Sequence, residues 1–221
     1  MQASQKKDSR IQTPFNNTWP LAVKRIGDFG IAFLGLLCLA PVLGIVALLI
    51  RLDSPGPVLF YQWRVGFRGE WFRILKFRTM VSNADEILGH YLEGNPMQRL
   101  NWEQFQKLWE DPRLTRVGRF LRKYSLDELP QLWNIIKGEM SLVGPRPFFP
   151  EQCQAYGPAY ACYIRVRPGL TGLWQVMGRN HTSFIERANW DVYYISHWSL
   201  RLDIDILIKT IRVVLSGNGA F

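Results

Sequence analysis

The clearest pattern in the sequence is a long apolar segment in its first quarter. Residues 29–50 contain no charged side chain, and these 22 residues exceed the roughly 20 that a helix needs to cross a bilayer. The segment has no small-residue cleavage site and is longer than the apolar core of a signal peptide. We therefore predict a membrane segment at residues 21–52, preceded by a flexible leader at residues 1–20.

Two features of this segment bear on how it meets a membrane. Pro41 lies in its middle, and basic residues flank both of its ends. Proline removes one helical hydrogen bond and clashes with the preceding turn, so we expect a membrane break at Ala40-Pro41. Basic flanks on both sides leave the positive-inside rule undecided. A helix that turns at the proline and returns to the same membrane face fits both features, and a kinked single span is the alternative.

After this segment the pattern becomes that of a soluble domain. Residues 58–61 and 71–77 are predicted strands around a turn at Gly66 and Gly69. Helices are predicted at residues 97–110, 115–123, 126–137, 183–197 and 200–215, and in 126–137 the apolar residues share one face with helical spacing. Gly138 is expected to end the third of these helices. The last helix has one polar and one broad apolar face, so it either packs on a core or lies on a membrane.

Composition narrows the class of protein. The chain has 221 residues, with 27 Lys and Arg against 18 Asp and Glu, a formal net charge of +9 and 48% hydrophobic residues. This hydrophobic share excludes an intrinsically disordered chain, and a mean hydropathy of −0.07 with one apolar segment excludes a multi-span transporter. Three cysteines without a C-x-x-C pair predict neither a disulfide framework nor a zinc site, and they fit a reducing compartment. The positive charge favours an anionic partner, whether a phosphate-bearing substrate, anionic lipid or nucleic acid.

Two adjacent carboxylates, Asp127 and Glu128, follow Ser125 at the start of a predicted helix. In one interpretation Ser125 is the N-cap and Glu128 its capping-box partner, while Asp127 complements the helix dipole. In the other, the many arginines nearby keep a carboxylate ionised, as a nucleophile toward phosphorus must be, or the carboxylate shares Mg²⁺ with a diphosphate. The residues alone leave both interpretations open.

Basic side chains near the carboxylate pair are candidates for binding phosphate. Lys76 and Arg78 share one face of a predicted strand, and Arg146 is held between two prolines, so it has less freedom to lose on binding. Each could instead be an exposed surface residue. Three further arginines frame the turn-rich loop 168–172, and three histidines lack metal-ligand spacing: Arg165, Arg167 and Arg179; His90, His181 and His197.

The chain resembles the bacterial sugar transferases, the monotopic polyprenyl-phosphate phosphoglycosyltransferases. The likeness extends from about residue 24 to residue 221, nearly the whole chain. Chance agreement does not account for so many blocks in the same order. The blocks are KRIGDFG, SPGPVLFYQWRVGFRG, FRILKFRTM, DPRLTRVGRFLRKYSLDELPQLWNIIKGEMSLVGPRP, RVRPGLTGLWQVMGR and DVYYISHWSLRLDIDILIKTI.

The resemblance implies an α/β fold of the helix-rich α+β kind. A re-entrant membrane helix-break-helix would join a compact cytosolic catalytic domain at residues 53–221, with amphipathic helices at the membrane interface. Family members lie on the cytosolic face of the bacterial inner membrane and, with Mg²⁺, transfer a sugar 1-phosphate from a UDP-sugar to undecaprenyl phosphate. This is the first membrane step of exopolysaccharide or O-antigen synthesis. The expected partners are thus UDP-sugar, undecaprenyl phosphate and inner-membrane lipid; nucleic acid is not expected, and a homo-oligomer stays open.

The resemblance also implies roles for individual residues. By match to the family motif, Asp127 is the nucleophile and Mg²⁺ ligand, and it would form a covalent aspartyl-phosphosugar intermediate. Glu128 is implied as its partner, in metal binding or acceptor activation. The implied phosphate and nucleotide ligands are Arg122 and Arg146, followed by Lys76, Arg78 and Arg167.

Two features depart from the family pattern. Relatives often have Ser-Pro at the membrane break where this chain has Ala40-Pro41, so a hydroxyl that could satisfy a freed carbonyl is missing. Larger members have more membrane helices and another domain before the shared region, so we expect either a small-form enzyme or the catalytic part of a larger relative. The C-terminal half looks most like enzymes that use UDP-hexoses, which favours UDP-galactose or UDP-glucose. The alternative from another class is a catalytically silent membrane-tethered scaffold of the same fold.

Overall fold

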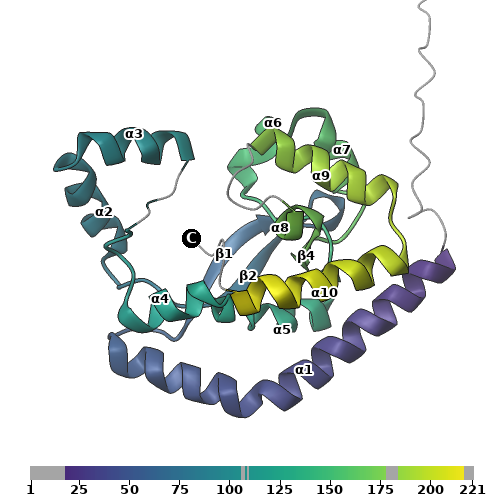
Figure 1. Ribbon diagram of the computed structural model, residues 1–221, viewed down its shortest axis with the longest axis horizontal. Coiled ribbons are helices and arrows are strands. Elements are labelled where there is room, and N and C mark those ends of the chain that lie inside the picture. The colour runs from purple at the N-terminus through teal and green to yellow at the C-terminus, as the bar shows by residue number, and fades with distance from the viewer. Residues whose placement is uncertain (1–17, 106–107, 109, 178–183, 217–221) are drawn as a thin grey trace, which may run out of the picture.

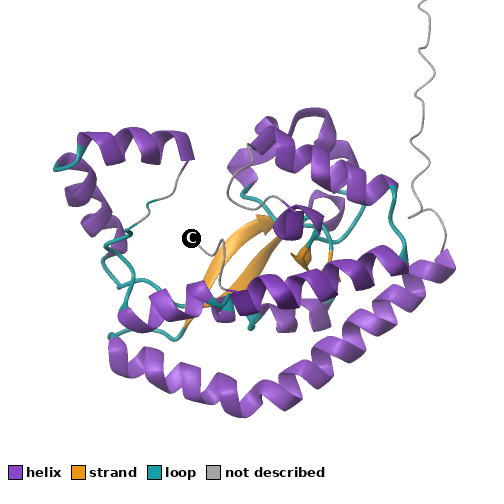
Figure 2. Cartoon of the chain, viewed as in Figure 1, coloured by secondary structure: helices purple, strands orange, loops and turns teal. Residues whose placement is uncertain are grey.

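The protein is described by a computed structural model that covers residues 18–105, 108, 110–177 and 184–216 (Figure 1). Most of the expected leader lies outside the described residues, and the first helix begins at Thr18. Helices dominate the described chain, and its strands form two small two-stranded sheets (Figure 2). The expected helix-rich α+β class is confirmed.

The apolar segment forms one long helix, α1 (Thr18–Asp53), along one edge of the molecule (Figure 1). It contains 36 residues, with Pro41 inside it. In place of the break expected at Ala40-Pro41, the helix is bent and continuous (Figure 1). A proline removes one hydrogen bond and displaces the preceding turn, which bends a helix without ending it when the neighbouring turns remain bonded.

Both ends of α1 are tied to the same folded domain. Near its beginning, Lys24 Nζ lies 2.6 Å from Asp203 Oδ2, and the Arg25 guanidinium donates to two backbone carbonyls of α5 (Gln131–Lys137). At its end, Asp53 accepts a hydrogen bond of 3.0 Å from the backbone N–H of Val117. A helix that spanned a bilayer would hold its ends on opposite sides, where a single domain could not contact both.

An antiparallel hairpin follows α1. It consists of β1 (Leu59–Val65) and β2 (Trp71–Phe77), with η2 (Phe67–Gly69) in its turn. The second predicted strand is confirmed, and the first, predicted at residues 58–61, extends to Val65.

Successive side chains of a strand point to opposite sides of the sheet, so the hairpin has two faces. Arg64 and Lys76 lie on one face, since Arg64 is paired with Phe72 and Phe60 is paired with Lys76. Arg73 lies on the opposite face, so the hairpin separates two sets of basic side chains.

The remaining elements are short helices and two strands of three residues. The helix predicted at residues 126–137 is divided into η3 and α5, because Pro130 has no N–H for a continuous helix. Gly138 ends α5 with a φ of 87°, as expected. The bounds are α2 (Ala84–Glu93), α3 (Pro96–Phe105), α4 (Arg116–Lys123), η3 (Leu126–Glu128), β3 (Ser141–Val143), η4 (Pro150–Gln152), α6 (Cys153–Tyr156), η5 (Gly157–Ala159), α7 (Tyr160–Tyr163), β4 (Gly169–Thr171), α8 (Leu173–Met177), α9 (Phe184–Ser196) and α10 (Leu200–Ser216).

The main core joins the hairpin to α5, α9 and α10. Ile135, Met140 and Tyr194 are almost fully buried in it, and Ala32 brings α1 into the same cluster. Strands β3 and β4 pair in parallel beside this core, with Ser141 opposite Gly169. This pairing fixes the start of the loop that follows β3.

Helix α10 packs part of its apolar surface on the core and leaves another part exposed. Asp203 and Ile206 are buried against the core. A second apolar stripe on the same helix stays exposed. Its members are Leu200, Ile204, Ile208, Ile211 and Leu215.

Helix α4 approaches the segment that follows β2 so closely that only glycine fits at position 118. A Cβ atom on Gly118 would lie 2.0 Å from the Thr79 carbonyl oxygen, whereas a Cβ on Gly89 in α2 would meet nothing within 4 Å. We expect Gly118→Ala to lower the free energy of unfolding by about 1–3 kcal/mol, because backbone must move. Gly89→Ala, the matched control, should raise it by up to about 1 kcal/mol through helix propensity. Urea unfolding in detergent, followed by circular dichroism, measures both; equal shifts in one direction would contradict the close approach.

Candidate active site

The two carboxylates lie in η3, a single turn between α4 and α5. Ser125, just before the turn, has a φ of 54°, and its side chain makes no capping hydrogen bond. The capping-box interpretation is therefore wrong. A non-glycine residue in this left-handed region costs free energy, and such residues gather at functional sites.

Glu128 is held by two cations from other parts of the chain. Its Oε1 accepts hydrogen bonds of 2.8 Å from Lys76 on β2 and 2.8 Å from Arg146 in the loop after β3. Burial alone would raise the pKa of Glu128, but the charges of Arg146 and Lys76 outweigh it and hold the pKa well below its usual range. Glu128 is therefore ionised and fixed in place.

Asp127 has the opposite environment although it is the adjacent residue. Its side chain is buried, with 8% of the residue exposed, and it accepts no hydrogen bond from the residues that the structure describes. The nearest cation, Lys76 Nζ, is 3.9 Å from Oδ2. Burial raises the pKa of Asp127, and the charge of Glu128 adds to this against the pull of Lys76. The sequence predicted that surrounding arginines would favour its ionised form, but the closest contacts go to Glu128 instead.

Arg122 on α4 is the third predicted cation that the fold brings to this pair. Its Nε donates to Thr79 Oγ1 at 3.0 Å, and burial lowers its pKa while Asp127 raises it. Lys76, Arg122 and Arg146 thus come from β2, α4 and the loop after β3 to surround the carboxylates. Distant segments of the chain build one site.

The structure does not bring Arg78 into this site. Its guanidinium donates to the carbonyls of Ser54 and Pro55 at 2.7 Å each, and only 7% of the residue is exposed. Arg78 follows the end of β2, so the strand alternation that would have paired it with Lys76 no longer applies. The expected phosphate ligand instead holds the turn after α1.

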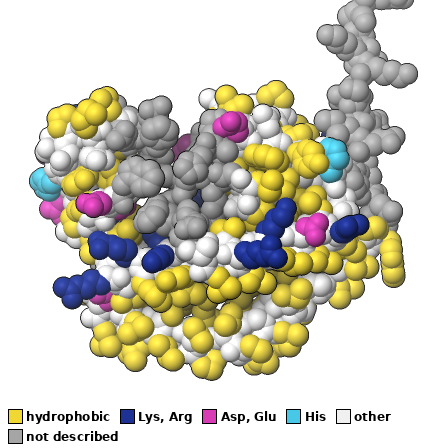
Figure 3. Space-filling view, viewed as in Figure 1, with side chains coloured by type: hydrophobic (Ala, Val, Ile, Leu, Met, Phe, Trp, Pro, Cys, Tyr) yellow, Lys and Arg dark blue, Asp and Glu magenta, His cyan; other side chains and the backbone are white. Residues whose placement is uncertain are grey.

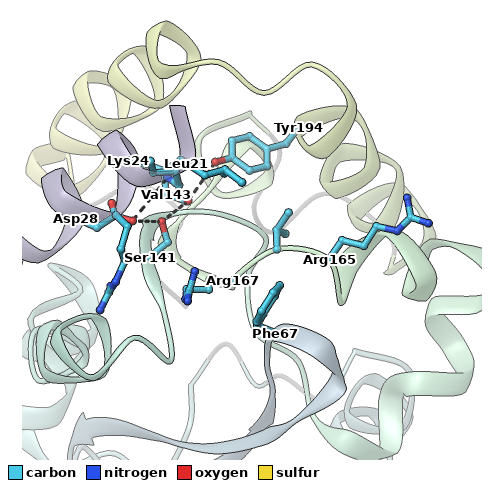
Figure 4. Close-up of a pocket in the computed structure, with 11 residues that line it drawn as sticks. Leu21, Lys24, Asp28, Phe67, Ser141, Val143, Arg165, Arg167 and Tyr194 are labelled. Atoms are coloured by element: carbon cyan, nitrogen blue, oxygen red, sulfur yellow. Dashed lines mark hydrogen bonds and ion pairs between the residues drawn. The ribbon is translucent and has the colours of Figure 1, made fainter. Parts of the chain in front are cut away.

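Arg167 also lies elsewhere, in a pocket beside the first part of α1 (Figure 4). Its Nε donates to the Gly138 carbonyl at 2.8 Å, and its guanidinium carbon lies 5.2 Å from the centre of the Phe67 ring. Burial and the charge of Arg25 lower its pKa, with no contribution from Asp127 or Glu128. Arg165 lines this same pocket.

Two arginines that the sequence analysis did not single out lie behind Arg146. Arg187 on α9 donates to the Arg146 carbonyl oxygen, and its Nε is 3.8 Å from Asp191. Burial and the charges of Arg146 and Arg187 lower the pKa of Arg64 on β1. The strand alternation that places Arg64 on the face of Lys76 could have indicated Arg64; no sequence signal marks Arg187.

A cation at the two carboxylates would take its remaining ligands from water or from a substrate. No group of three or more His, Cys, Asp or Glu side chains forms a metal cluster within the described part of the chain. Asp127, with its unbonded carboxylate, is the residue that fits Mg²⁺, which takes one or two carboxylates plus phosphate oxygens. His90 and His197 are exposed and separate from the site, while Arg179 and His181 lie outside the described residues.

The chain is similar to known proteins over nearly its whole length. Residues 19–217 match the family described as bacterial sugar transferase. The exopolysaccharide production protein ExoY of Sinorhizobium fredii is 45% identical over 198 residues, 90% of this chain and 88% of that protein. The UDP-galactose-lipid carrier transferase of Erwinia amylovora is 46% identical over 199 residues, 90% of this chain and 42% of that protein.

A third relative is the undecaprenyl-phosphate galactose phosphotransferase of Salmonella typhimurium. It is 42% identical over 212 residues, which cover 96% of this chain and 44% of that protein. The chain therefore spans less than half the length of two of these relatives and most of the length of the other. Since the family pattern and the relatives both cover about nine-tenths of it, the chain belongs to the bacterial sugar transferase family.

Proposed function

We propose that this protein transfers a sugar 1-phosphate from a UDP-sugar to undecaprenyl phosphate, forming undecaprenyl-diphosphate-sugar and UMP. The observation that most supports this is the asymmetry of the two carboxylates. Glu128 is fixed by Lys76 and Arg146, while Asp127 beside it has a carboxylate without a hydrogen bond among the described residues. A carboxylate free to attack, next to cations that neutralise phosphate oxygens, suits nucleophilic phosphoryl transfer. The names of the relatives point to the same class of reaction.

In the first proposed step, a carboxylate oxygen of Asp127 attacks the β-phosphorus of the donor. The new bond joins that oxygen to phosphorus, and the bond between the β-phosphorus and the bridging oxygen breaks. UMP leaves with the electron pair of the broken bond, and the sugar phosphate remains on Asp127. Lys76, Arg122 and Arg146 neutralise the negative charge that gathers on the phosphate oxygens.

In the second proposed step, an oxygen of undecaprenyl phosphate attacks the same phosphorus. The bond to Asp127 breaks, its carboxylate is restored, and the lipid diphosphate is released. One diphosphate is exchanged for another, so the reaction is close to isoenergetic and the protein's main task is to align groups and offset charge. Glu128 serves by holding Lys76 and Arg146 in position.

Mg²⁺ belongs to this proposal as a partner of Asp127. The Asp127 carboxylate is buried among cations without a hydrogen bond from the described residues, which leaves its oxygens available to a metal ion. When bound together with the donor, Mg²⁺ would supply positive charge to the diphosphate.

The membrane part of the proposal depends on α1. Residues Trp19–Asp53 are long and apolar enough to cross a membrane, and only 11% of their most apolar stretch is buried. Figure 3 shows hydrophobic side chains over the edge formed by α1 and Lys and Arg side chains along a band next to it. Basic residues beside an apolar surface suit anionic lipid headgroups. We therefore place α1 as a re-entrant helix in the cytosolic leaflet of the inner membrane, with α10 at the interface.

The proposed donor sugar rests on the names of relatives and on the resemblance, not on the site geometry. Relatives named for galactose transfer favour UDP-galactose, and the resemblance of the C-terminal half to enzymes that use UDP-hexoses keeps UDP-glucose as the other candidate. A catalytically silent scaffold of the same fold is the competing proposal. The two differ in one cheap measurement, turnover with a panel of UDP-sugars.

We expect Asp127→Asn to lower UMP release on the order of 10³-fold or more while the fold stays intact, because the amide cannot attack phosphorus. The assay uses the purified full chain in detergent with undecaprenyl phosphate, Mg²⁺ and a panel of UDP-sugars. Asp205→Asn, an exposed carboxylate on α10, is the matched control and should keep wild-type turnover. Near wild-type turnover in Asp127→Asn would remove Asp127 as the nucleophile, and no turnover by folded wild type would favour the scaffold.

The environment of Asp127 predicts how kcat/KM depends on pH, and it predicts opposite shifts of that dependence in two variants. The attacking form of Asp127 is lost as pH falls, so kcat/KM should decrease on the acidic side at a pH above the usual range for aspartate. Lys76→Met removes a charge that lowers the Asp127 pKa, so this acidic limb should move to higher pH. Glu128→Gln removes a charge that raises it, so the limb should move to lower pH. Lys137→Met, at the exposed end of α5, should leave the limb unchanged; shifts of the same sign in both site variants would contradict the assignment.

A further inference from the structure

Arg64 is a charged side chain that the chemistry above does not use. It lies on β1, and its guanidinium carbon is 3.5 Å from the centre of the Phe149 ring. One terminal nitrogen donates to Gln62 Oε1 at 2.5 Å, while Nε is buried without a hydrogen-bond partner among the described residues. The aromatic ring and the glutamine thus hold a guanidinium whose hydrogen-bonding capacity is only partly used.

The charges around Arg64 are mostly of its own sign. Burial and the cations Arg146 and Arg187 lower its pKa to about 9. Glu128 is the carboxylate that favours its charge, but Glu128 is already bonded to Arg146 and Lys76. Arg64 is half-buried, with its Nε atom fully buried, and charges withdrawn from water in proteins are normally paired, so a bound anion would complete this arrangement.

The position of Arg64 on the hairpin indicates which of the two anionic substrates, the UDP-sugar or undecaprenyl phosphate, it could contact. Phe77, next to Lys76 on β2, packs in one cluster with Val46 and Ile50 of α1, so that end of the hairpin adjoins the membrane helix. Lys76 is paired with Phe60 on β1, and Arg64 lies four residues after Phe60, roughly 13 Å away along the strand. Its neighbour Val65 packs in a cluster whose members come from outside α1.

We propose that Arg64 binds the nucleotide phosphate of the UDP-sugar donor, at the end of the hairpin away from Lys76 and from the Val46 and Ile50 part of α1. This inference rests on the proposed function, because it assigns one end of the same site. The lipid carries its phosphate at the membrane surface, beside the Lys76 end of the hairpin. The nucleotide is water-soluble and extends beyond the phosphorus that Asp127 attacks, so it is the substrate that reaches Arg64.

The test compares Arg64→Met with Arg73→Met. Both positions are arginines of the hairpin that stack on an aromatic ring, Phe149 and Trp63 respectively, but Arg73 lies on the opposite face. We expect Arg64→Met to raise the KM for the UDP-sugar about 10- to 100-fold, as loss of a charge-assisted hydrogen bond does, with the KM for undecaprenyl phosphate unchanged. Arg73→Met should change neither KM. Arg64→Lys, which keeps the charge, should recover part of the loss.

The effect of UDP on the unfolding temperature tests this inference independently of the proposed reaction. UDP added to the wild-type protein should raise the unfolding temperature, and the rise should be lost in Arg64→Met but kept in Asp127→Asn. Without UDP, Arg64→Met should unfold at the same or a higher temperature than wild type, because a buried charge beside two cations has been removed. A residue that only supported the fold would give a lower temperature instead.

Each remaining outcome is decisive. An unchanged donor KM in Arg64→Met, or a rise in the KM for undecaprenyl phosphate alone, overturns the assignment while leaving the transfer reaction in place. Wild-type protein that is folded but neither binds UDP nor releases UMP contradicts the proposed function itself. If Arg64→Met does not fold, the same two measurements, the KM for the UDP-sugar and the UDP-induced rise in unfolding temperature, are made on Arg64→Lys and Arg64→Gln. Wild-type values in both of these variants overturn the inference.

Discussion

The site depends on the contact of one carboxylate, that of Glu128, with two cations. Lys76 belongs to β2, Glu128 to η3 and Arg146 to the loop after β3, so these bonds of 2.8 Å join three segments that are far apart in the sequence. A buried carboxylate is costly unless cations and hydrogen bonds compensate it, and here both are present. Because Glu128 satisfies these cations, the adjacent Asp127 is left with a buried and unbonded carboxylate. The reactivity proposed for one residue therefore follows from the structural role of the other.

The membrane helix is placed by the same part of the fold. Val46 and Ile50 of α1 pack with Phe77, the residue after Lys76, while Lys24 near the other end pairs with Asp203 of α10. Leu126, the residue before Asp127, packs against the same cluster, so the carboxylate pair lies close to this part of α1. A phosphate at the end of a long lipid chain can reach such a site without leaving the membrane surface. The bend of α1, which keeps both of its ends on one domain, is what makes this proximity available.

Sequence periodicity predicted the elements that have a clear apolar face and a defined end. The hairpin strand at residues 71–77 and the end of α5 at Gly138 follow that rule. Periodicity did not predict the interruption of the helix expected at residues 126–137, where Pro130 separates η3 from α5. Among the site residues, Lys76, Arg122 and Arg146 were found by their resemblance to a family motif. Arg78 and Arg167 match as well, yet their partners are backbone carbonyls, which side-chain identity does not indicate. Such contacts are set by tertiary packing.

The arrangement of arginines behind Arg146 places like charges together at the proposed donor site. Arg187 is offset by Asp191 and stacks near Trp174, and Arg146 is offset by Glu128. Arg64 stands beside both cations without a carboxylate of its own among the described residues. Repulsion among these partly buried cations raises the free energy of the protein without substrate, and a diphosphate bound in the proposed site would offset it. The binding energy of the anion is then larger than the contacts alone would give, because part of it is relief of that repulsion. A pre-formed excess of positive charge is therefore a physical means of selecting a doubly charged donor over neutral sugars.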